Sequence, residues 1–220
     1  MKFSNTFFLI FLSIVFMSCV GIPDSNKGDI HLRPSTPIVN NFYITPENEE
    51  TKIKTGFWGI ALGLDFYHSK NQFLNLKASS AIDFFLPFPA AIDPSFVDGE
   101  EDEVFRSIYF TLSNNHRVKN FIFGYGLSYA INYWNYSYNN YSGTPDLPPS
   151  TYINKKYDSF GLIFPVYYFF NKYLGVGIEY RPSFFRPNLN DKFLYEHLIS
   201  IELSTRIPFY NSNQKKFFKW

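Results

Sequence analysis

Residues 174–181 read Leu-Gly-Val-Gly-Ile-Glu-Tyr-Arg, so a large apolar side chain alternates with a glycine or a charged residue. Side chains of a β-strand point alternately to its two faces, and a period of two therefore indicates a strand. One face of this strand holds Leu174, Val176, Ile178 and Tyr180, and the other holds Gly175, Gly177, Glu179 and Arg181. Large apolar groups opposite small or charged groups are typical of a strand in a membrane-spanning β-barrel.

Six further segments alternate in the same way, near residues 58–66, 74–84, 107–113, 121–132, 160–168 and 196–209. Residues 36–45 are a weaker candidate, in which Pro37 favours an edge or a strand end. The connections alternate between short and long, as in outer-membrane barrels with short periplasmic turns and longer outer loops. We therefore expect an all-β fold, an eight-stranded antiparallel up-and-down transmembrane β-barrel over residues 36–210, which closes only if 36–45 is a strand.

The composition is consistent with a single domain of this kind. The chain has 220 residues and a net charge of +1, which gives no strong field to attract nucleic acid. Aromatic residues make up 21% of the chain, yet the mean hydropathy is only -0.16, because apolar residues alternate with polar ones. After the N-terminus no stretch is apolar for long enough to form a transmembrane helix.

Residues 1–19 have the features of an export signal, with a positive residue followed by a short apolar segment at 7–17. The sequence Phe16-Met17-Ser18-Cys19 resembles the lipobox of bacterial lipoproteins, in which the cysteine is lipidated. Ordinary signal-peptidase cleavage after Gly21 is the alternative. Because Cys19 is the only cysteine, the mature domain is expected to have no internal disulfide.

The strand and loop pattern over residues 36–210 resembles the small eight-stranded outer-membrane barrel proteins, including the outer-membrane β-barrel domain family common in Bacteroidetes. The resemblance implies a location in the outer membrane of a Gram-negative bacterium, with extracellular loops and periplasmic termini. It also implies contact with outer-membrane lipid and lipopolysaccharide, and insertion by the barrel-assembly machinery. An aromatic residue often closes the last strand in that family, and Phe209 fits. Residues 20–35 would then be a linker and 211–220 a C-terminal tail.

The face with small residues also carries charges, which would lie in the lumen. These residues are Asp65, Lys77, Asp83, Glu179, Arg181, Glu196, Glu202 and Arg206. Unpaired charges in a narrow lumen are costly, so we expect them to form a network of ion pairs that makes the barrel rigid. A path for protons or ions is the functional alternative.

A lipocalin-like, lipid-anchored soluble barrel that binds a small apolar ligand is the main alternative fold, since Gly56-Phe57-Trp58 matches the G-x-W of lipocalins. Volume argues against it, because an eight-stranded barrel is just wide enough for side chains to fill. Phe, Tyr, Leu and Ile from seven strands would overfill the inside, whereas Gly, Ala and Ser fit. On the apolar face, titratable residues are expected only near strand ends, at Arg106 and His197, where a charge costs little.

A lipid A-modifying barrel enzyme would use a serine and a histidine on the lipid face near the outer rim. His197 has the expected face and height, but the positions opposite it, Pro182 and Phe184, supply no serine. We therefore assign no catalytic residue, metal or cofactor.

The long loops 87–102 and 136–153 are the expected contacts for an extracellular ligand, because Tyr, Asn and Ser suit recognition in the second loop. The acidic run Asp98–Glu103 is expected to be a solvated loop; binding of a divalent cation, or bridging of one to lipopolysaccharide, is the alternative. The sequence thus predicts a structural or surface-interaction role.

Overall fold

The computed structural model describes residues 25–83, 100–140 and 148–212. The predicted signal peptide with Cys19 and most of the predicted tail 211–220 lie outside these ranges. Within them the chain forms the following strands: β1 (Ile30–Ile44), β2 (Lys52–Phe57), β3 (Ala61–Tyr67), β4 (Gln72–Ile82), β5 (Glu100–Val118), β6 (Phe121–Asn139), β7 (Thr151–Phe169), β8 (Leu174–Phe185), β9 (Glu196–Thr205) and β10 (Ile207–Tyr210).

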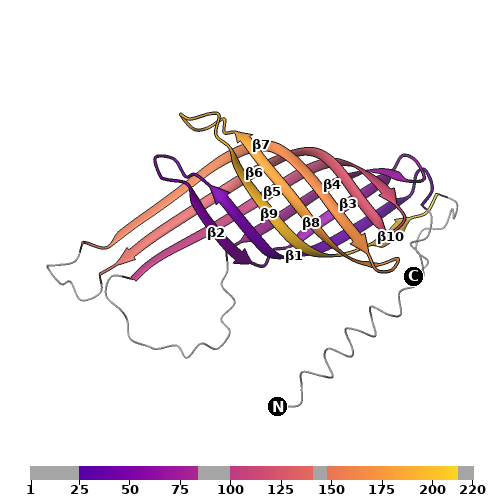
Figure 1. Ribbon diagram of the computed structural model, residues 1–220, viewed down its shortest axis with the longest axis horizontal. Helices are drawn as coiled ribbons and strands as arrows, with labels where there is room; N and C mark the ends of the chain where they lie inside the picture. Colours follow the sequence, from indigo (N-terminus) through magenta and orange to yellow (C-terminus); the bar gives the residue numbers. More distant parts are fainter. Residues whose placement is uncertain (1–24, 84–99, 141–147, 213–220) are drawn as a thin grey trace, which may run out of the picture.

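The strands form one antiparallel sheet that closes on itself into a barrel of tilted strands (Figure 1). β1 closes it, because one of its edges pairs with β9 and β10 while the other pairs with β2 and β3. β2 and β3 share one position in the ring, and β9 and β10 share another, so the ring has eight strands. The predicted eight-stranded antiparallel barrel is confirmed, and the weak first strand is the one that closes it.

The first strand is longer than predicted. β1 begins at Ile30, so the last part of the predicted linker 20–35 is a strand paired with β3. Pro37, which favoured an edge or a strand end, is accommodated locally, since the pairing of β1 with β9 shifts register between Pro37 and Val39. A bulge of this kind tolerates a residue that has no backbone N–H to donate.

The predicted strand at 58–66 begins only at Ala61, as β3, and a separate strand, β2, precedes it at Lys52–Phe57. Trp58 lies between them with a φ of 76°, in the left-handed region. At Gly59 a Cβ atom would lie 2.1 Å from the carbonyl oxygen of Ser80, so the close approach of the next strand requires glycine here. On the N-terminal side of this break, β2 pairs with the second half of β1, with Lys52–Phe57 opposite Val39–Ile44.

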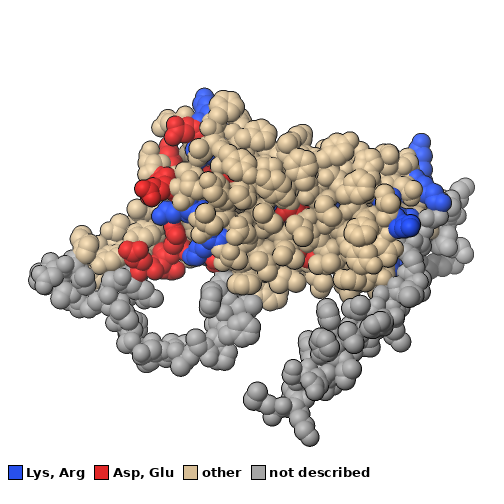
Figure 2. Space-filling model, viewed as in Figure 1, with Lys and Arg blue, Asp and Glu red and all other residues tan. Residues whose placement is uncertain are grey.

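The two faces of the sheet are sorted as the alternation predicted. Leu127 and Ile178 point outward and are 65% and 52% exposed, whereas their neighbours Ser128 and Glu179 are buried in the lumen. On the face that Figure 2 shows, the result is a broad, largely uncharged band across the middle of the barrel, with most charged side chains toward its two ends.

The expectation that Arg106 and His197 are the titratable groups of the outer face was too narrow. Lys156 is exposed and Asp158 half-buried on the same face, next to the inward, buried Tyr157. Both lie toward the loop end of β7, because that strand begins at Thr151, earlier than predicted.

Strands β5, β6 and β7 each have 19 residues and extend past the ring at one end (Figure 1). The predicted loop 136–153 is therefore wrong in its bounds, since β6 continues to Asn139 and β7 begins at Thr151. The predicted loop 87–102 likewise overlaps β5, which begins at Glu100 and includes part of the acidic run. At its other end β5 continues to Val118, past the end of the predicted strand 107–113. Where both faces of a strand meet water, the apolar alternation that reveals strands is lost.

Two apolar layers fill the lumen near its ends. The layer toward the long connections contains Phe42, Ile44, Ala81, Phe105, Tyr109, Ala130, Trp134 and Leu198. The layer toward the short turns contains Tyr67, Phe73, Ile122, Tyr167 and Phe169. The charged side chains considered next lie between and beside these layers.

Candidate functional site

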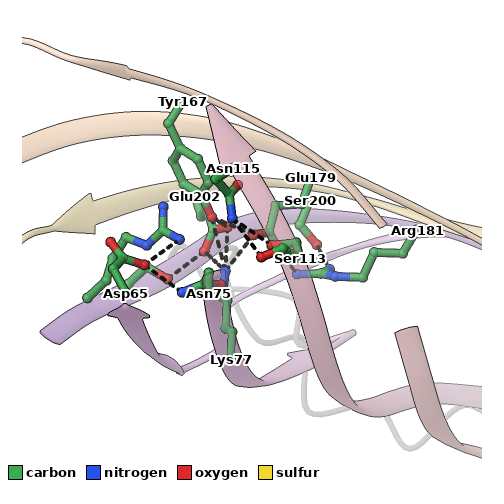
Figure 3. Close-up of polar contacts among 12 residues, drawn as sticks. Asp65, Asn75, Lys77, Ser113, Asn115, Tyr167, Glu179, Arg181, Ser200 and Glu202 are labelled. Carbon is green, nitrogen blue, oxygen red and sulfur yellow. Dashed lines mark hydrogen bonds and ion pairs between the residues drawn. The ribbon is translucent and has the colours of Figure 1, made fainter. Parts of the chain in front are cut away.

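The centre of the lumen holds a cluster of paired charges, which we call the ionic layer (Figure 3). Nζ of Lys77 on β4 lies 2.9 Å from Oε1 of Glu179 on β8 and 2.6 Å from Oε1 of Glu202 on β9. The hydroxyl of Tyr167 on β7 lies 2.5 Å from the same two oxygens. Ser35 on β1 donates a hydrogen bond to Oε2 of Glu202 at 2.6 Å. The layer therefore joins strands that are far apart around the ring.

Tyr167 reaches these carboxylates because Gly177 on the adjacent strand has no side chain. A Cβ atom at Gly177 would lie 2.2 Å from the Tyr167 ring, which is closer than real Cβ contacts. The small residues that the sequence places on the lumen face thus make room for a large inward ring.

Arg181 extends the ionic layer toward the long connections. It forms an ion pair with Glu179 and donates to Oγ of Ser200 at 3.0 Å. Ser200 in turn donates to Oδ1 of Asn40 at 2.7 Å, and the Arg181 guanidinium lies 4.9 Å from the centre of the Tyr109 ring. These contacts connect β8 to β9, β1 and β5.

Arg33 and Asp65 form the other side of the ionic layer. Their NH2 and Oδ1 atoms are 3.0 Å apart, and Asn75 donates to the same Oδ1 atom at 2.7 Å. The Arg33 guanidinium lies 4.7 Å from the centre of the Tyr167 ring. Arg33 lies in the predicted linker 20–35 and was not among the predicted lumen residues, although the alternation continues through Leu32 and Arg33.

The ionic layer is electrically balanced. It contains three cations and three anions, all at most 2% exposed: Arg33, Lys77, Arg181, Asp65, Glu179 and Glu202. Burying ions is costly unless they are paired and hydrogen-bonded, and here each carboxylate contacts at least one cation.

Two of the predicted lumen residues lie toward the long connections, outside the ionic layer. Glu196 contacts Arg186 at 3.3 Å and accepts hydrogen bonds at 2.8 Å from the backbone N–H of Thr45 and from the Tyr157 hydroxyl. Asp83 pairs with Lys54 at 2.7 Å.

Arg206 lies at the opposite end, near the short turns. It donates to Nδ1 of His31 at 2.6 Å, to Oγ of Ser25 at 2.8 Å and to the Tyr67 hydroxyl. An Nδ1 atom that accepts a hydrogen bond carries no proton, so His31 is neutral in this arrangement. No carboxylate lies within ion-pair distance of Arg206 among the residues that the structure describes.

The chain just before β1 is fastened to the end of the barrel strand β10. Asp29 accepts hydrogen bonds from the backbone N–H of Asn26, and from the N–H and hydroxyl of Ser212. Burial raises the pKa of the Asp29 carboxyl, but these hydrogen bonds outweigh it, so the pKa lies below its ordinary value.

His197 lies among aromatic side chains on the outer face. Its ring stacks on Tyr43 with a centroid distance of 4.9 Å, and Tyr180 and Tyr195 lie beside it. A hydrogen bond with Tyr180 raises the pKa of Tyr195, in the loop before β9, to about 12. Pro182 is opposite His197 on β8, as expected. This aromatic environment is typical of a packed rim.

Neither a metal site nor a helical membrane span is found where the chain is described. Residues 25–83, 100–140 and 148–212 contain no group of three or more His, Cys, Asp or Glu that could hold a metal ion. The same ranges contain no helix that is long and apolar enough to cross a membrane.

The parts of β5, β6 and β7 that extend past the ring form a second candidate site, which we call the surface sheet and define as residues 100–104, 135–139 and 151–154. Glu101 and Asp102 are exposed, and Tyr152 is 69% exposed. Burial, followed by the nearby carboxylate of Glu101, raises the pKa of Tyr136.

The base of the surface sheet is fixed to the β1–β2 hairpin. The indole N–H of Trp134 donates to Oε1 of Glu103 at 2.7 Å. Nζ of Lys52 and Nζ of Lys155 lie 5.9 and 5.7 Å from the centre of a Trp134 ring, and Lys155 pairs with Glu49 at 2.9 Å. These contacts fix the position of the surface sheet relative to the β1–β2 hairpin.

Comparisons with known proteins support the fold. No protein-family model matches the sequence, and no curated protein matches it. Among solved structures, the chain is similar to Ail, the attachment invasion locus protein of Yersinia pestis, with 8% identity, a TM-score of 0.50, and coverage of 82% of this chain and 99% of that one. Neisserial surface protein A is also similar, with 9% identity, a TM-score of 0.43, and coverage of 82% and 97%. At such low identity the likeness is one of fold.

Proposed function

We propose that this chain is an outer-membrane β-barrel that presents the surface sheet to an extracellular ligand. The observation that carries the proposal is the direction of the two faces: apolar side chains surround the ring, and the ionic layer lies inside it. Lipid accepts such an exterior, whereas a charge there costs about 2–4 kcal/mol at mid-membrane. A soluble barrel that binds an apolar ligand inside would need the opposite arrangement.

The same reasoning gives an orientation. The short turns, the beginning of β1 and the short strand β10 lie at one end of the barrel, and the long connections and the surface sheet lie at the other (Figure 1). Because outer-membrane barrels have short periplasmic turns, this orientation places the surface sheet outside the cell. The barrel-assembly machinery would then insert the chain into the outer membrane. Lipidation of Cys19 would add an anchor at the periplasmic end, and intact mass measurement of the mature protein tests it.

The surface sheet has features that suit ligand contact. Past Phe105, β5 pairs only with β6, and before Phe160, β7 pairs only with β6, in the ranges that the structure describes. Both edges therefore have backbone groups to which an extended segment could add. Exposed Tyr152 and the carboxylates of Glu101 and Asp102 favour a ligand with basic side chains.

A sealed lumen supports this interaction role over conduction. The ionic layer lies between two layers of buried apolar side chains, and its charges are already paired. We expect no single-channel current from the folded protein in planar bilayers. Steady current steps would favour the ion path instead.

The test combines a folding measurement with a binding measurement. The wild-type membrane fraction in SDS should migrate differently with and without boiling, as a closed barrel does. A variant with 137–152 replaced by Asn-Gly keeps Trp134 and Lys155, and should retain the mobility shift while cells lose surface adhesion. Absence of the shift in the wild type would overturn the barrel in the membrane; full adhesion by the shortened variant would overturn the role of the surface sheet.

A further inference from the structure

We infer that a groove on the outer face of the barrel binds the phosphorylated headgroup of lipid A. This inference rests on the proposed outer-membrane location and names a lipid ligand distinct from that of the surface sheet. The groove has a volume of about 400 Å³ and crosses β4 to β7 at the base of the surface sheet; its lining includes Ser80, Ile82, Arg106, Ile108, Tyr133 and Asn135.

Two cations flank the groove in one row of the sheet. Ile82 pairs with Arg106, Arg106 with Tyr133, and Tyr133 with Lys156, on four successive strands. Arg106 is exposed and has no ion-pair partner among the described side chains. Nζ of Lys156 lies 5.5 Å from the centre of the Tyr133 ring, so its charge is held toward the groove.

The spacing of these cations suits one phosphate group. Two inter-strand steps separate Arg106 from Lys156, which places their backbones about 10 Å apart. Long side chains can close this span around a phosphate, and hydrogen bonds between charged groups are about twice as strong as neutral ones. The nearest carboxylate on the same face of β7, Asp158, accepts a hydrogen bond from Asn188 at 2.7 Å and does not line the groove.

The remaining lining suits a glycolipid rather than a free anion. Oδ1 of Asn135 is buried and has no hydrogen-bond partner among the described residues, so it can accept a hydrogen bond from a sugar hydroxyl. Ile82 and Ile108 are apolar surfaces against which an acyl chain can lie. The groove is at the end of the barrel with the long connections, which the proposed orientation places in the outer leaflet. Cations, an acceptor for a sugar hydroxyl and apolar contacts therefore meet in one site.

The test is native mass spectrometry of the refolded full-length protein in detergent, titrated with bisphosphorylated lipid A, dephosphorylated lipid A or phosphatidylglycerol. The wild type should bind bisphosphorylated lipid A at least about tenfold more tightly than either other lipid, because the other lipids lack the phosphate contacts that this groove would make. Tenfold weaker binding corresponds to about 1.4 kcal/mol of binding free energy. The variant R106Q/K156Q should lose this preference. Lys172→Gln, in an exposed turn at the other end, is the matched control and should keep it.

The outcomes separate the two proposals. Equal binding of lipid A by wild type and R106Q/K156Q, or equal binding of phosphatidylglycerol, would overturn the groove. Each variant must show the boiling-dependent mobility shift before its lipid binding is compared. The double variant Arg106→Lys and Lys156→Arg keeps both charges and should retain binding. Loss of the mobility shift in the wild type would instead overturn the proposed membrane barrel.

Discussion

Replacing Lys77 with methionine tests how far the ionic layer holds the barrel together. Lys77 contacts both Glu179 and Glu202 and is 2% exposed, so its removal leaves carboxylates buried without that partner. Removing one partner of a buried ion pair costs about 3–5 kcal/mol. Methionine keeps most of the side-chain volume, so packing should contribute little to the loss.

The assay is urea unfolding in lipid vesicles, followed by tryptophan fluorescence. Lys77→Met should lose about 3–5 kcal/mol of unfolding free energy, whereas Lys172→Met, in an exposed turn, should stay within about 0.5 kcal/mol of wild type. Adding Glu202→Gln to Lys77→Met removes one orphaned charge and should recover part of the loss. A Lys77→Met protein within about 1 kcal/mol of wild type, or a double variant less stable than the single one, would refute the reasoning.

Three further changes test other parts of the structure. Gly177→Val should destabilise the barrel by about 1–3 kcal/mol by overpacking against Tyr167, measured by the same unfolding assay, and an unchanged midpoint would contradict the close contact. Leu76→Lys places a charge on the exposed outer face and should cost about 2–4 kcal/mol in vesicles, whereas a water-facing site would tolerate it. The lowered pKa of Asp29 means that its stabilising contribution is present above the unfolded pKa and is lost as the pH falls through the folded pKa. Asp29→Asn should therefore reduce stability at neutral pH and flatten its dependence on acid pH; an unchanged pH profile would count against the fastening to Ser212.

The fold was largely predictable because one face of each strand in the ring is apolar and the other is not. The alternation at 174–181 placed Ile178 outside and Glu179 inside, and the structure agrees. The pattern failed where that asymmetry ends. In residues 136–139 both faces carry Tyr, Ser or Asn, so the continuing strand β6 looked like a loop.

The contents of the lumen were less predictable than the ring around it. Lys77, Glu179 and Glu202 were chosen by face alone, and the structure brings them together. Their common partner Tyr167 could not be foreseen, because its position depends on space left by a glycine on another strand. Arg33 was missed because the polar stretch around Pro34 favoured a linker where β1 in fact begins, at Ile30. Pairing across a lumen depends on the stagger of strands around the ring, which no local pattern contains.

The central claim is that the apolar face contacts lipid, and quenching of a fluorescent label tests it most directly. The Cys19→Ala variant removes the only native cysteine, so that single cysteines can be labelled. One label is placed at Leu127→Cys on the apolar outer face, and another at Tyr152→Cys on the surface sheet. In vesicles, brominated lipid should quench the label at 127 and aqueous iodide the label at 152. Iodide quenching at 127, with no effect of brominated lipid there, would contradict the account.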